Sequence, residues 1–583
     1  MPASDIVAAL LAAGVVRRDA LGVAVADGVG LGLATDTESW SVATTDPVGV
    51  VRAVEAAIGP RWVWWTKETA ESLVREGLRV ETCWDLAAVH RHVAGGWRAE
   101  PARIWATLQR LSVASIPVLG QLELLSALDS AGADDGDAGE PVRPDGHLRP
   151  EWACGGWRDS PDRAAHWAAL AMTARRLQRE LLAAPHGSTR SRARDPETAA
   201  RSESTAELLC AELQADGLPI DVARAEAIIA SFVGPRPTSP AEAAELRRQR
   251  DLVVQRHEGV GTGTDLRNQA QVKAMLNRLG VDVPDTRARR LEPLRADNPA
   301  VDALLTWRKA ERIDTTFGYA WLDEHVGADG RLRGGWSASD GAAGRMTAQA
   351  GLHNMPADFR DAVAADAGHV FIRADLGQIE PRVLAAVSGD AALAAATTAD
   401  DLYAPVATQL GVERAVAKIA VLAAMYGQTS GTAGAALRGL EQTYRVAMRY
   451  LQDADDDGRA ARDVYTYGGR RVRMWRDPNV NDHPGAMGAR GRYARNAVVQ
   501  GAAAELFKTW AVTVRARGAA ISARIVLCLH DELLVHAPEE HGAAGSALLD
   551  DCLQEAAARW APDRSVRFVA DTSVIRRWSD AKA

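Results

Sequence analysis

The sequence predicts a multidomain α+β protein, and three observations support this fold class. The chain has 583 residues, which is long enough for several domains. Its first 190 residues alternate strand-length apolar runs with helical patterns, whereas residues 205–330 are mainly helical. Later in the chain, two β-branched apolar runs meet at a tight break, which is the pattern of a β-hairpin.

Composition excludes several classes of protein. Hydrophobic residues make up 47% of the chain, which is ample for large cores. The cysteines lie far apart in spacings that no metal site uses, and their odd number argues against a disulfide framework. A net charge of −8 excludes a protein that is basic throughout, but a local basic face could still bind nucleic acid. We find no membrane-spanning run and no secretory signal, so we expect a cytoplasmic protein with no membrane partner.

Local patterns predict the elements of the first 190 residues. Residues 21–26 and 30–34 form a predicted β-hairpin. Asp46 is suited to cap a helix over residues 48–58, and Pro47 fits its first position. The next predicted elements are a strand at 61–65, a helix at 69–76 and a strand at 78–82 that leads to Asp85. Two polar stretches, 130–146 and 185–196, predict a surface loop and a linker.

A predicted hairpin over residues 525–537 carries three polar residues, His530, Asp531 and Glu532, at its tip. Carboxylates in such an apolar setting cost desolvation energy unless a cation lies nearby. The alternative is an ordinary surface hairpin in which Asp531 simply forms the turn. That alternative is disfavoured, because an exposed hairpin should alternate polar and apolar residues.

A second acidic strand end lies far away in the sequence. Residues 369–375 predict a strand that ends on Asp375, and a helix follows in which Pro381 is tolerable only in the first turn. Asp375 and Asp531 could together hold two Mg²⁺ ions, because Mg²⁺ needs only a few carboxylates beside substrate phosphates. Such a pair clamps the attacking and leaving oxygens of a phosphoryl transfer. Spacing alone does not establish this pairing.

Several motifs give the chain a resemblance to a known family. The segment Asp375-Leu376-Gly377-Gln378-Ile379-Glu380-Pro381-Arg382 resembles motif A of the family A DNA polymerases, the bacterial polymerase I type, and residues 530–532 resemble motif C. Residues 413–427 are similar to motif B. In this predicted helix Arg414 and Lys418 share one face, where a triphosphate could bridge the two cations. A merely solvated face is the less favoured alternative, because the rest of the helix is apolar.

Weaker motifs follow in the family's order and extend the resemblance over residues 205–583. They are the segments 216–221, 268–272, 303–316, 344–347, 353–356, 469–472, 492–505 and 575–582. The resemblance implies a right-hand polymerase fold preceded by a ribonuclease H-like, exonuclease-type α/β domain. The implied domains are the exonuclease-like domain at 1–190, a thumb at 205–330, palm segments at 331–384 and 476–583, and fingers at 385–475. We expect the large-fragment form, without a 5′-nuclease domain.

The resemblance also implies roles for individual residues. The implied catalytic residues are Asp375, Asp531 and Glu532, with Asp375 and Asp531 as ligands of two Mg²⁺ ions for which Mn²⁺ could substitute. The implied dNTP-binding residues are Gln378, Glu380, Arg414, Lys418, Leu422, Tyr426 and His530. The implied DNA-binding residues are Arg345, Asn354, Arg470, Arg492, Asn496 and Gln500.

Departures from the family pattern mark two places. Leu376, Gly377, Pro381, Tyr403, Val421 and Leu422 replace usual residues of the polymerase site, so we expect altered sugar and base discrimination with intact chemistry. Asp36-Thr37-Glu38 has the D-x-E form of the exonuclease metal site, but it falls just past the second predicted strand. The late helix at 167–172 lacks the family's Tyr and Asp. We therefore expect a degenerate exonuclease-like domain.

The expected function is template-directed DNA synthesis in replication or repair. The primer 3′-OH would attack the α-phosphate of a dNTP, and the expected partners are primer–template DNA and dNTPs. We expect a monomer located at the nucleoid. One alternative is a DNA-binding accessory protein on a catalytically altered polymerase fold. Another, a proofreading-competent enzyme, requires metal-binding acids that the sequence does not supply.

Overall fold

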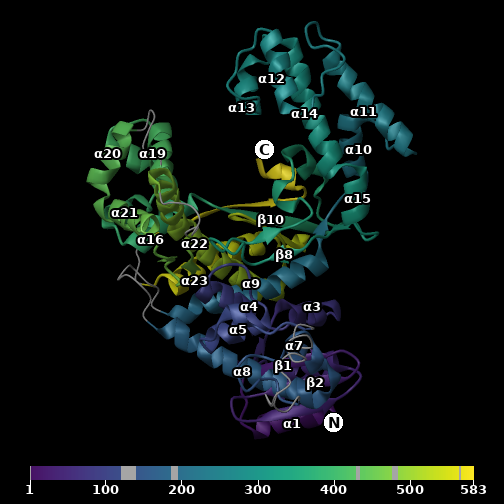
Figure 1. Cartoon of the computed structure of the whole chain (residues 1–583), viewed down its shortest axis with the longest axis vertical. Coiled ribbons are helices and arrows are strands. Elements are labelled where there is room, and N and C mark those ends of the chain that lie inside the picture. The colour runs from purple at the N-terminus through teal and green to yellow at the C-terminus, as the bar shows by residue number, and fades with distance from the viewer. Residues whose placement is uncertain are drawn as a thin grey trace, which may run out of the picture. The chain divides into compact units, whose positions relative to one another are not determined.

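The computed structural model describes residues 2–119, 139–184, 195–427, 434–475, 483–562 and 566–582 (Figure 1). These residues form two compact units. The first consists of Met1–Asp216, Gly335–Thr347 and Ile372–Val574, and the second of Gly217–Gly334, Ala348–Phe371 and Ile575–Ala583. Most of the predicted loop at 130–146 and of the predicted linker at 185–196 lies outside the described residues.

The N-terminal part of the first unit is built on a five-stranded sheet with the order β3-β2-β1-β4-β5. The strands are β1 (Ala20–Ala26), β2 (Gly30–Ala34), β3 (Ser39–Ala43), β4 (Arg61–Trp64) and β5 (Thr82–Asp85). Strands β1, β2 and β3 are antiparallel, and β4 and β5 continue the sheet in parallel from β1. The predicted hairpin at 21–34 is confirmed.

Helices cover both faces of this sheet. They are α1 (Ala3–Ala12), α2 (Pro47–Ala57), α3 (Lys67–Arg75), α4 (Leu86–Ala94), α5 (Pro101–Leu108), α7 (Pro150–Ala153) and α8 (Pro161–Ala183). Asp46 caps α2 by accepting a 2.7 Å hydrogen bond from the backbone N of Gly49, so the predicted cap is confirmed. The strand predicted at 78–82 is wrong. Leu78 and Val80 are buried before the strand, which runs from Thr82 to Asp85.

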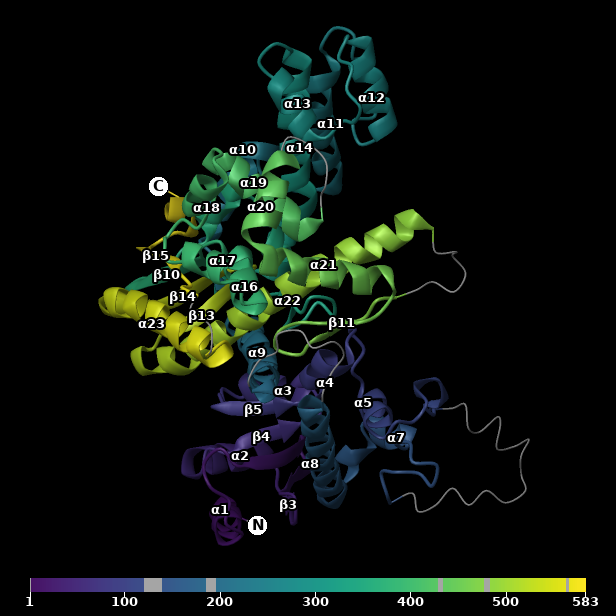
Figure 2. The same ribbon diagram turned by 90° about the vertical axis from the view of Figure 1, so that its left-hand side faces the viewer.

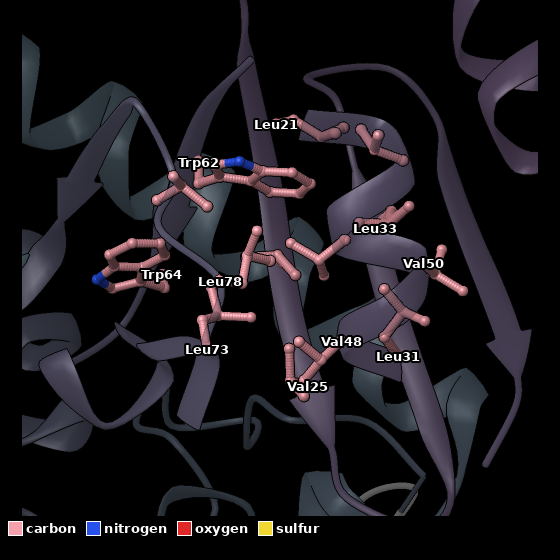
Figure 3. Packing of buried hydrophobic residues seen from close by; sticks show 14 of the residues in the cluster. Leu21, Val25, Leu31, Leu33, Val48, Val50, Trp62, Trp64, Leu73 and Leu78 are labelled. Atoms are coloured by element: carbon pink, nitrogen blue, oxygen red, sulfur yellow. The ribbon is translucent and has the colours of Figure 1, made fainter. Parts of the chain in front are cut away.

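Alternate residues of β1 enter two different cores, as expected for a strand buried on both faces. Leu21 and Val25 pack with α2 and with Trp62 of β4 (Figure 3). On the other face Ala24 packs against α8, whose side toward the sheet is apolar and includes Trp167 and Met172. An added Cβ at Gly32 would lie 2.1 Å from the backbone of Ala164, so glycine lets α8 approach the sheet closely.

The second sheet has the order β13-β14-β10-β15. Its strands are β10 (His369–Leu376), β13 (Arg524–Leu529), β14 (Glu532–Pro538) and β15 (Ala570–Ile575). The antiparallel pair β13–β14 confirms the predicted hairpin. Leu529 pairs with Glu532, which leaves His530 and Asp531 as a two-residue loop at its tip.

Nine helices in the described part of the chain belong with this sheet in the first unit. They are α9 (Pro196–Asp216), α16 (Ile379–Ser388), α17 (Ala391–Ala396), α18 (Tyr403–Leu410), α19 (Arg414–Tyr426), α20 (Gly434–Thr443), α21 (Arg445–Arg459), α22 (Pro484–Gly518) and α23 (Gly542–Trp560). Of these, α9, α22 and α23 contact the strands of the sheet directly. Figure 2 shows α21 alongside α22, and α22 also contacts α9, α16, α19 and α23. The expected domain boundary at residue 205 falls inside α9, which packs with the first unit.

The second unit is mainly helical, as the pattern of residues 205–330 predicted. Its helices are α10 (Val222–Val233), α11 (Pro240–Gln255), α12 (Gln269–Arg278), α13 (Ala288–Leu291), α14 (Pro299–Phe317) and α15 (Tyr319–His325). Asn268 caps α12 by accepting hydrogen bonds from the backbone N atoms of Ala270 and Gln271. No helix in the described part of the chain combines the length and apolar character that crossing a bilayer requires.

Candidate active site

The two predicted metal-binding acids lie at neighbouring strand ends. Asp375 is the penultimate residue of β10, and Asp531 lies in the hairpin loop that leads into β14, the strand next to β10. The backbone N of Leu376 donates a 3.0 Å hydrogen bond to the backbone O of Asp531, which fastens the loop to the end of β10. The fold therefore brings together two acids that are far apart in the sequence.

The electrostatics of this acid pair favour a cation. Burial, followed by the charge of Asp531, raises the pKa of Asp375 to about 6. Burial and the neighbouring carboxylates of Glu532 and Glu380 raise the pKa of Asp531 as well. Carboxylates that oppose each other's ionisation gain most from a positive charge placed between them. Oxygen donors of this kind suit Mg²⁺.

These acids do not form a complete metal site by themselves. The described residues contain no group of three or more His, Cys, Asp or Glu side chains arranged to hold a metal ion. An Mg²⁺ ion commonly takes one or two carboxylates and completes its shell with water and substrate phosphates. Asp375 and Asp531 fit that partial role.

Arg373 connects the acids of three adjacent strands. Its guanidinium donates to Asp375 on β10 at 2.5 Å, to Glu532 on β14 at 3.1 Å and to Asp571 on β15 at 3.1 Å. Its side chain is only 7% exposed. Sequence analysis missed this residue, because in the linear sequence it is a single charge inside an apolar strand.

Two predicted residues contact the carboxylate of a third, Glu380, and a fourth contacts one of these two. Glu380, in the first turn of α16, accepts a 3.0 Å hydrogen bond from Arg345 and a 3.2 Å hydrogen bond from the hydroxyl of Tyr426 at the end of α19. Gln500 of α22 also hydrogen-bonds the side chain of Tyr426. Both oxygens of Glu380 are therefore held by side chains from distant segments, which fixes its orientation.

Two non-glycine residues at the site adopt left-handed backbone conformations. Gln378 has φ 55° just before α16, and His530 has φ 56° in the hairpin loop. Such conformations are uncommon outside glycine and concentrate at functional sites. Both residues adjoin segments that carry the acids, and burial, followed by the charge of Arg345, lowers the pKa of His530.

Asp401 links the motif A segment to α19. Its carboxylate accepts a 2.7 Å hydrogen bond from Gln378 and an ion pair from Arg414. The sequence interpretation required a bound anion to offset the repulsion between Arg414 and Lys418. In the structure, the carboxylate of Asp401 already neutralises the charge of Arg414. Lys418 lies exposed one turn further along α19. Sequence analysis did not assign a role to Asp401.

Three of the residues that depart from the family pattern, Tyr403, Val421 and Leu422, lie on α18 and α19. Tyr403, the first residue of α18, is buried, and the guanidinium of Arg414 lies 5.9 Å from the centre of its ring. Burial raises the pKa of Tyr403 to about 12. Leu422 is half-buried on α19, one turn before Tyr426.

One face of α22 carries three of the predicted DNA-binding residues at helical spacing. Arg492 is exposed, whereas Asn496 and Gln500 are partly buried. The side-chain oxygen of Asn496 is buried and has no hydrogen-bond partner among the described residues. A buried acceptor without a partner is uncommon in native proteins, and a donor from a ligand is one way to satisfy it.

The prediction that Arg470 binds DNA is wrong, because this side chain is buried inside the protein. Its side chain is 1% exposed and forms a 2.6 Å ion pair with Glu203 of α9. Lys508 of α22, also fully buried, pairs with the other oxygen of Glu203. Arg470 therefore belongs to an internal ion cluster, which consists of Glu203, Arg470 and Lys508.

This ion cluster holds the loop that precedes Arg345. Lys508 donates to the backbone O atoms of Ala338 at 3.3 Å and Gly344 at 2.7 Å, and Arg470 donates to the hydroxyl of Ser339 at 3.1 Å. An added Cβ at Gly344 would lie 2.2 Å from Nε of Arg470. The cluster thus acts on the site indirectly. Lys508 was detectable as a rare lysine in an apolar helix, but its partner Glu203 was not.

The other predicted residues belong to the second unit or to the N-terminal part of the first unit. Asn354 ends the 3₁₀ helix η4 (Leu352–Asn354) in the second unit, where its backbone O accepts a 3.0 Å hydrogen bond from Arg312. Asp36 and Glu38 are exposed in the turn between β2 and β3. They are therefore not on the first strand, where the exonuclease chemistry requires its D-x-E acids, and the facing side of α8 is apolar.

The chain is similar to several curated DNA polymerases over about half of its length. It is 30% identical to DNA polymerase I of Chloroflexus aurantiacus over 355 residues, which are 53% of this chain and 37% of that protein. It is 29% identical over 298 residues to the thermostable DNA polymerase I of Thermus thermophilus, covering 46% of this chain and 36% of that protein. DNA polymerase theta of Caenorhabditis elegans is 26% identical over 312 residues, covering 50% of this chain and 19% of that protein. The matches thus span well under half of the length of these relatives.

A solved structure has the same fold over the whole chain. It is the POL domain of Pol1 from M. smegmatis in complex with DNA primer-template and dNTP, with a TM-score of 0.66 and 20% sequence identity. The match covers 100% of this chain and 99% of that one. In addition, residues 246–580, more than half of the chain, match the family model described as DNA polymerase family A. The chain therefore belongs to DNA polymerase family A.

Proposed function

We propose that the chain is a template-directed DNA polymerase that adds dNTPs to the 3′-OH of a primer. The observation that carries this proposal is the placement of Asp375 and Asp531 at neighbouring strand ends, beside the network of Glu380, Tyr426 and Arg345. The family membership and the polymerase I relatives support the same activity.

We assign the roles of the acids from their positions. Asp375 and Asp531 would hold two Mg²⁺ ions, for which Mn²⁺ can substitute. When bound, such ions neutralise the charge that develops on the transferred phosphoryl group. Glu532 is buried and ion-paired with Arg373, so it supports the position of Asp375 through that arginine.

Cationic and polar side chains would bind the substrates. Lys418 and Arg414, both exposed on α19, suit the triphosphate. Phosphate oxygens would supply negative charge beside these two cations, which have only the carboxylate of Asp401 at Arg414. Arg345 and the α22 face of Arg492, Asn496 and Gln500 suit the primer–template end, where amide and guanidinium groups can reach base edges and phosphates. Glu380, fixed by its two donors, would lie under the sugar and exclude a 2′-hydroxyl.

The N-terminal sheet would be an exonuclease-type, ribonuclease H-like domain that has lost its metal site. Its mixed five-stranded sheet and the covering helix α8 support the domain type. The exposed positions of Asp36 and Glu38 and the apolar face of α8 support the loss. Monomeric state and location at the nucleoid remain predictions.

Primer extension by the intact chain tests the proposal. A labelled primer on a template with a single T at the next position is incubated with Mg²⁺ and each dNTP alone. We expect extension with dATP and far less with the other three. If the chain binds the primer–template in a mobility-shift assay but extends it with no dNTP, it is the accessory DNA-binding protein instead.

A further inference from the structure

The cluster of Arg373, Asp375, Glu532 and Asp571, called here the acid-rich cluster, has an unusual charge balance. A single guanidinium contacts three carboxylates that come from three adjacent strands. Arginine stays charged at any pH at which the protein is folded. Asp531 is also close enough to raise the pKa of Asp375, so the acids clearly outnumber the cation.

Arg373 is placed to interact with the same carboxylate that the reaction needs. It lies two residues before Asp375 on β10, and side chains two apart on a strand point to the same face. Its donor reaches Oδ2 of Asp375 at 2.5 Å. Glu532 and Arg373 are both buried, whereas the side chain of Asp571 is 82% exposed. The guanidinium is therefore fixed mainly on Asp375 and Glu532.

We propose that Arg373 is a built-in cation of the acid-rich cluster that competes with divalent ions for Asp375 and lowers the affinity of the site for them. A fixed positive charge beside the carboxylate neutralises part of the negative potential. A divalent ion bound there therefore gains less electrostatic free energy. The same contacts hold Asp375 and Glu532 in place before any ion arrives.

A purely structural role for Arg373 makes a different prediction. If the guanidinium only braced β10, β14 and β15, its removal would lower the stability of the fold without tightening metal binding. Charge competition instead requires tighter binding when the charge is removed. The proposal rests on the proposed function in its choice of ligand, but metal binding is measured without DNA or dNTP, so a failure of either is recognised separately.

The test is a titration of the intact chain with Mn²⁺ alone, in which the free ion is followed by electron paramagnetic resonance. Arg373→Gln removes the charge and keeps an amide donor, and Arg373→Ser is a second variant that removes it. We expect both to bind Mn²⁺ about tenfold more tightly or better, because a unit charge acts on a divalent ion several ångströms away. Arg373→Lys keeps the charge and should bind within about twofold of the intact chain.

The control is Arg524→Gln, which makes the same change in net charge on β13. Arg524 is 61% exposed and begins the strand whose other end carries the hairpin loop. Its substitution should leave Mn²⁺ affinity unchanged. Thermal unfolding without metal shows which variants are folded, and only folded variants enter the comparison. Unchanged or weaker binding in the folded charge-removing variants, or equal tightening in Arg524→Gln, would overturn the proposal.

Discussion

The first unit contains two clusters built around a buried arginine, and their charge balance is opposite. In the cluster of Glu203, Arg470 and Lys508, one carboxylate is shared by two cations, and spare donors reach backbone carbonyls. In the acid-rich cluster, one guanidinium faces three carboxylates. The first cluster is wholly buried, whereas in the second only Arg373 and Glu532 are buried and the side chain of Asp571 is 82% exposed.

This difference in charge balance distinguishes a cluster that supports the fold from one that can bind ions. A carboxylate surrounded by cations is already neutralised, and burying such a group is tolerable only when its partners are in place. An excess of carboxylates leaves a negative electrostatic potential that attracts a further cation. The first cluster therefore fixes the loop before Arg345, and the second is where we expect ions to bind.

Removal of either proposed metal ligand, Asp375 of the acid-rich cluster or its neighbour Asp531, should have the largest effect. We expect Asp375→Asn and Asp531→Asn each to lower the rate of nucleotide incorporation by about a thousandfold or more, because a metal ligand stabilises transition-state charge by several kcal/mol. DNA affinity should hardly change, since phosphate contacts supply it. Single-turnover primer extension and mobility shifts measure the two quantities, and substantial extension by either variant would contradict the metal assignment.

Removal of the shared acid from the other cluster should affect folding first. Glu203→Gln leaves Arg470 and Lys508 buried beside each other without their counter-charge, which should cost about 3–5 kcal/mol of unfolding free energy. Urea unfolding at pH 7, followed by tryptophan fluorescence, gives this value. Glu68→Gln, a change of an exposed residue of the same unit, serves as the control and should be neutral. Equal stabilities for the two variants would show that the buried cluster is not a support.

The pH dependence of stability sharpens this test. Burial opposes ionisation of Glu203, but Arg470 and Lys508 outweigh it and lower the pKa of Glu203 to about 2, from an ordinary value of 4.5. The unfolded chain then binds the proton more readily, so the stabilisation is complete above about pH 4.5 and is lost as pH falls toward 2. The stability gap between the intact chain and Glu203→Gln should therefore shrink over that range, and a constant gap would argue against the pairing.

Sugar choice should respond more modestly. Glu380 is held by Arg345 and Tyr426, but Leu376 and Leu422 depart from the family pattern in the motifs that carry Glu380 and Tyr426. Exclusion by fit alone discriminates by about 1–3 kcal/mol. We expect dATP to be preferred over ATP opposite a template T, with measurable ribonucleotide incorporation that rises about tenfold in Glu380→Ala. An unchanged ratio in steady-state incorporation would show that Glu380 is not the gate.

The smallest expected effect is the absence of proofreading. Asp36 and Glu38 are exposed, and α8 presents Trp167 and Met172 to the sheet where a metal site would need acids. We expect no removal of 3′ nucleotides from single-stranded DNA with Mg²⁺ or Mn²⁺. If degradation occurred and disappeared in the Asp36→Ala/Glu38→Ala double variant, the domain would be an active exonuclease.

Local patterns predicted what local physics determines. The cap of α2 by Asp46 and the hairpin around Asp531 each depend on neighbouring residues, and both are confirmed. The strand at 78–82 was misplaced because Leu78 and Val80 are buried without pairing in the sheet, so an apolar alternation was not specific to a strand.

Long-range charge pairing could not be predicted. A Gly-Arg-Arg segment predicted an arginine on the DNA surface, but the partners of Arg470 come from α9 and α22, and no sequence signal connects them. The role of Arg373 could not be predicted from the sequence either, because two of its partners lie on other strands, β14 and β15. The family motifs compensated for this in part, because they paired Asp375 with Asp531 where spacing alone could not.

The most direct test of whether the ions of the reaction bind at Asp375 and Asp531 compares Mn²⁺ binding between variants of these acids and a variant of the Glu203 cluster. The intact chain, an Asp375→Asn/Asp531→Asn double variant and Glu203→Gln are titrated with Mn²⁺, and free ion is measured by electron paramagnetic resonance. The account predicts that the double variant loses the tight Mn²⁺ binding and that folded Glu203→Gln keeps it. Tight binding that survives in the double variant, or that is lost in folded Glu203→Gln, would contradict the account.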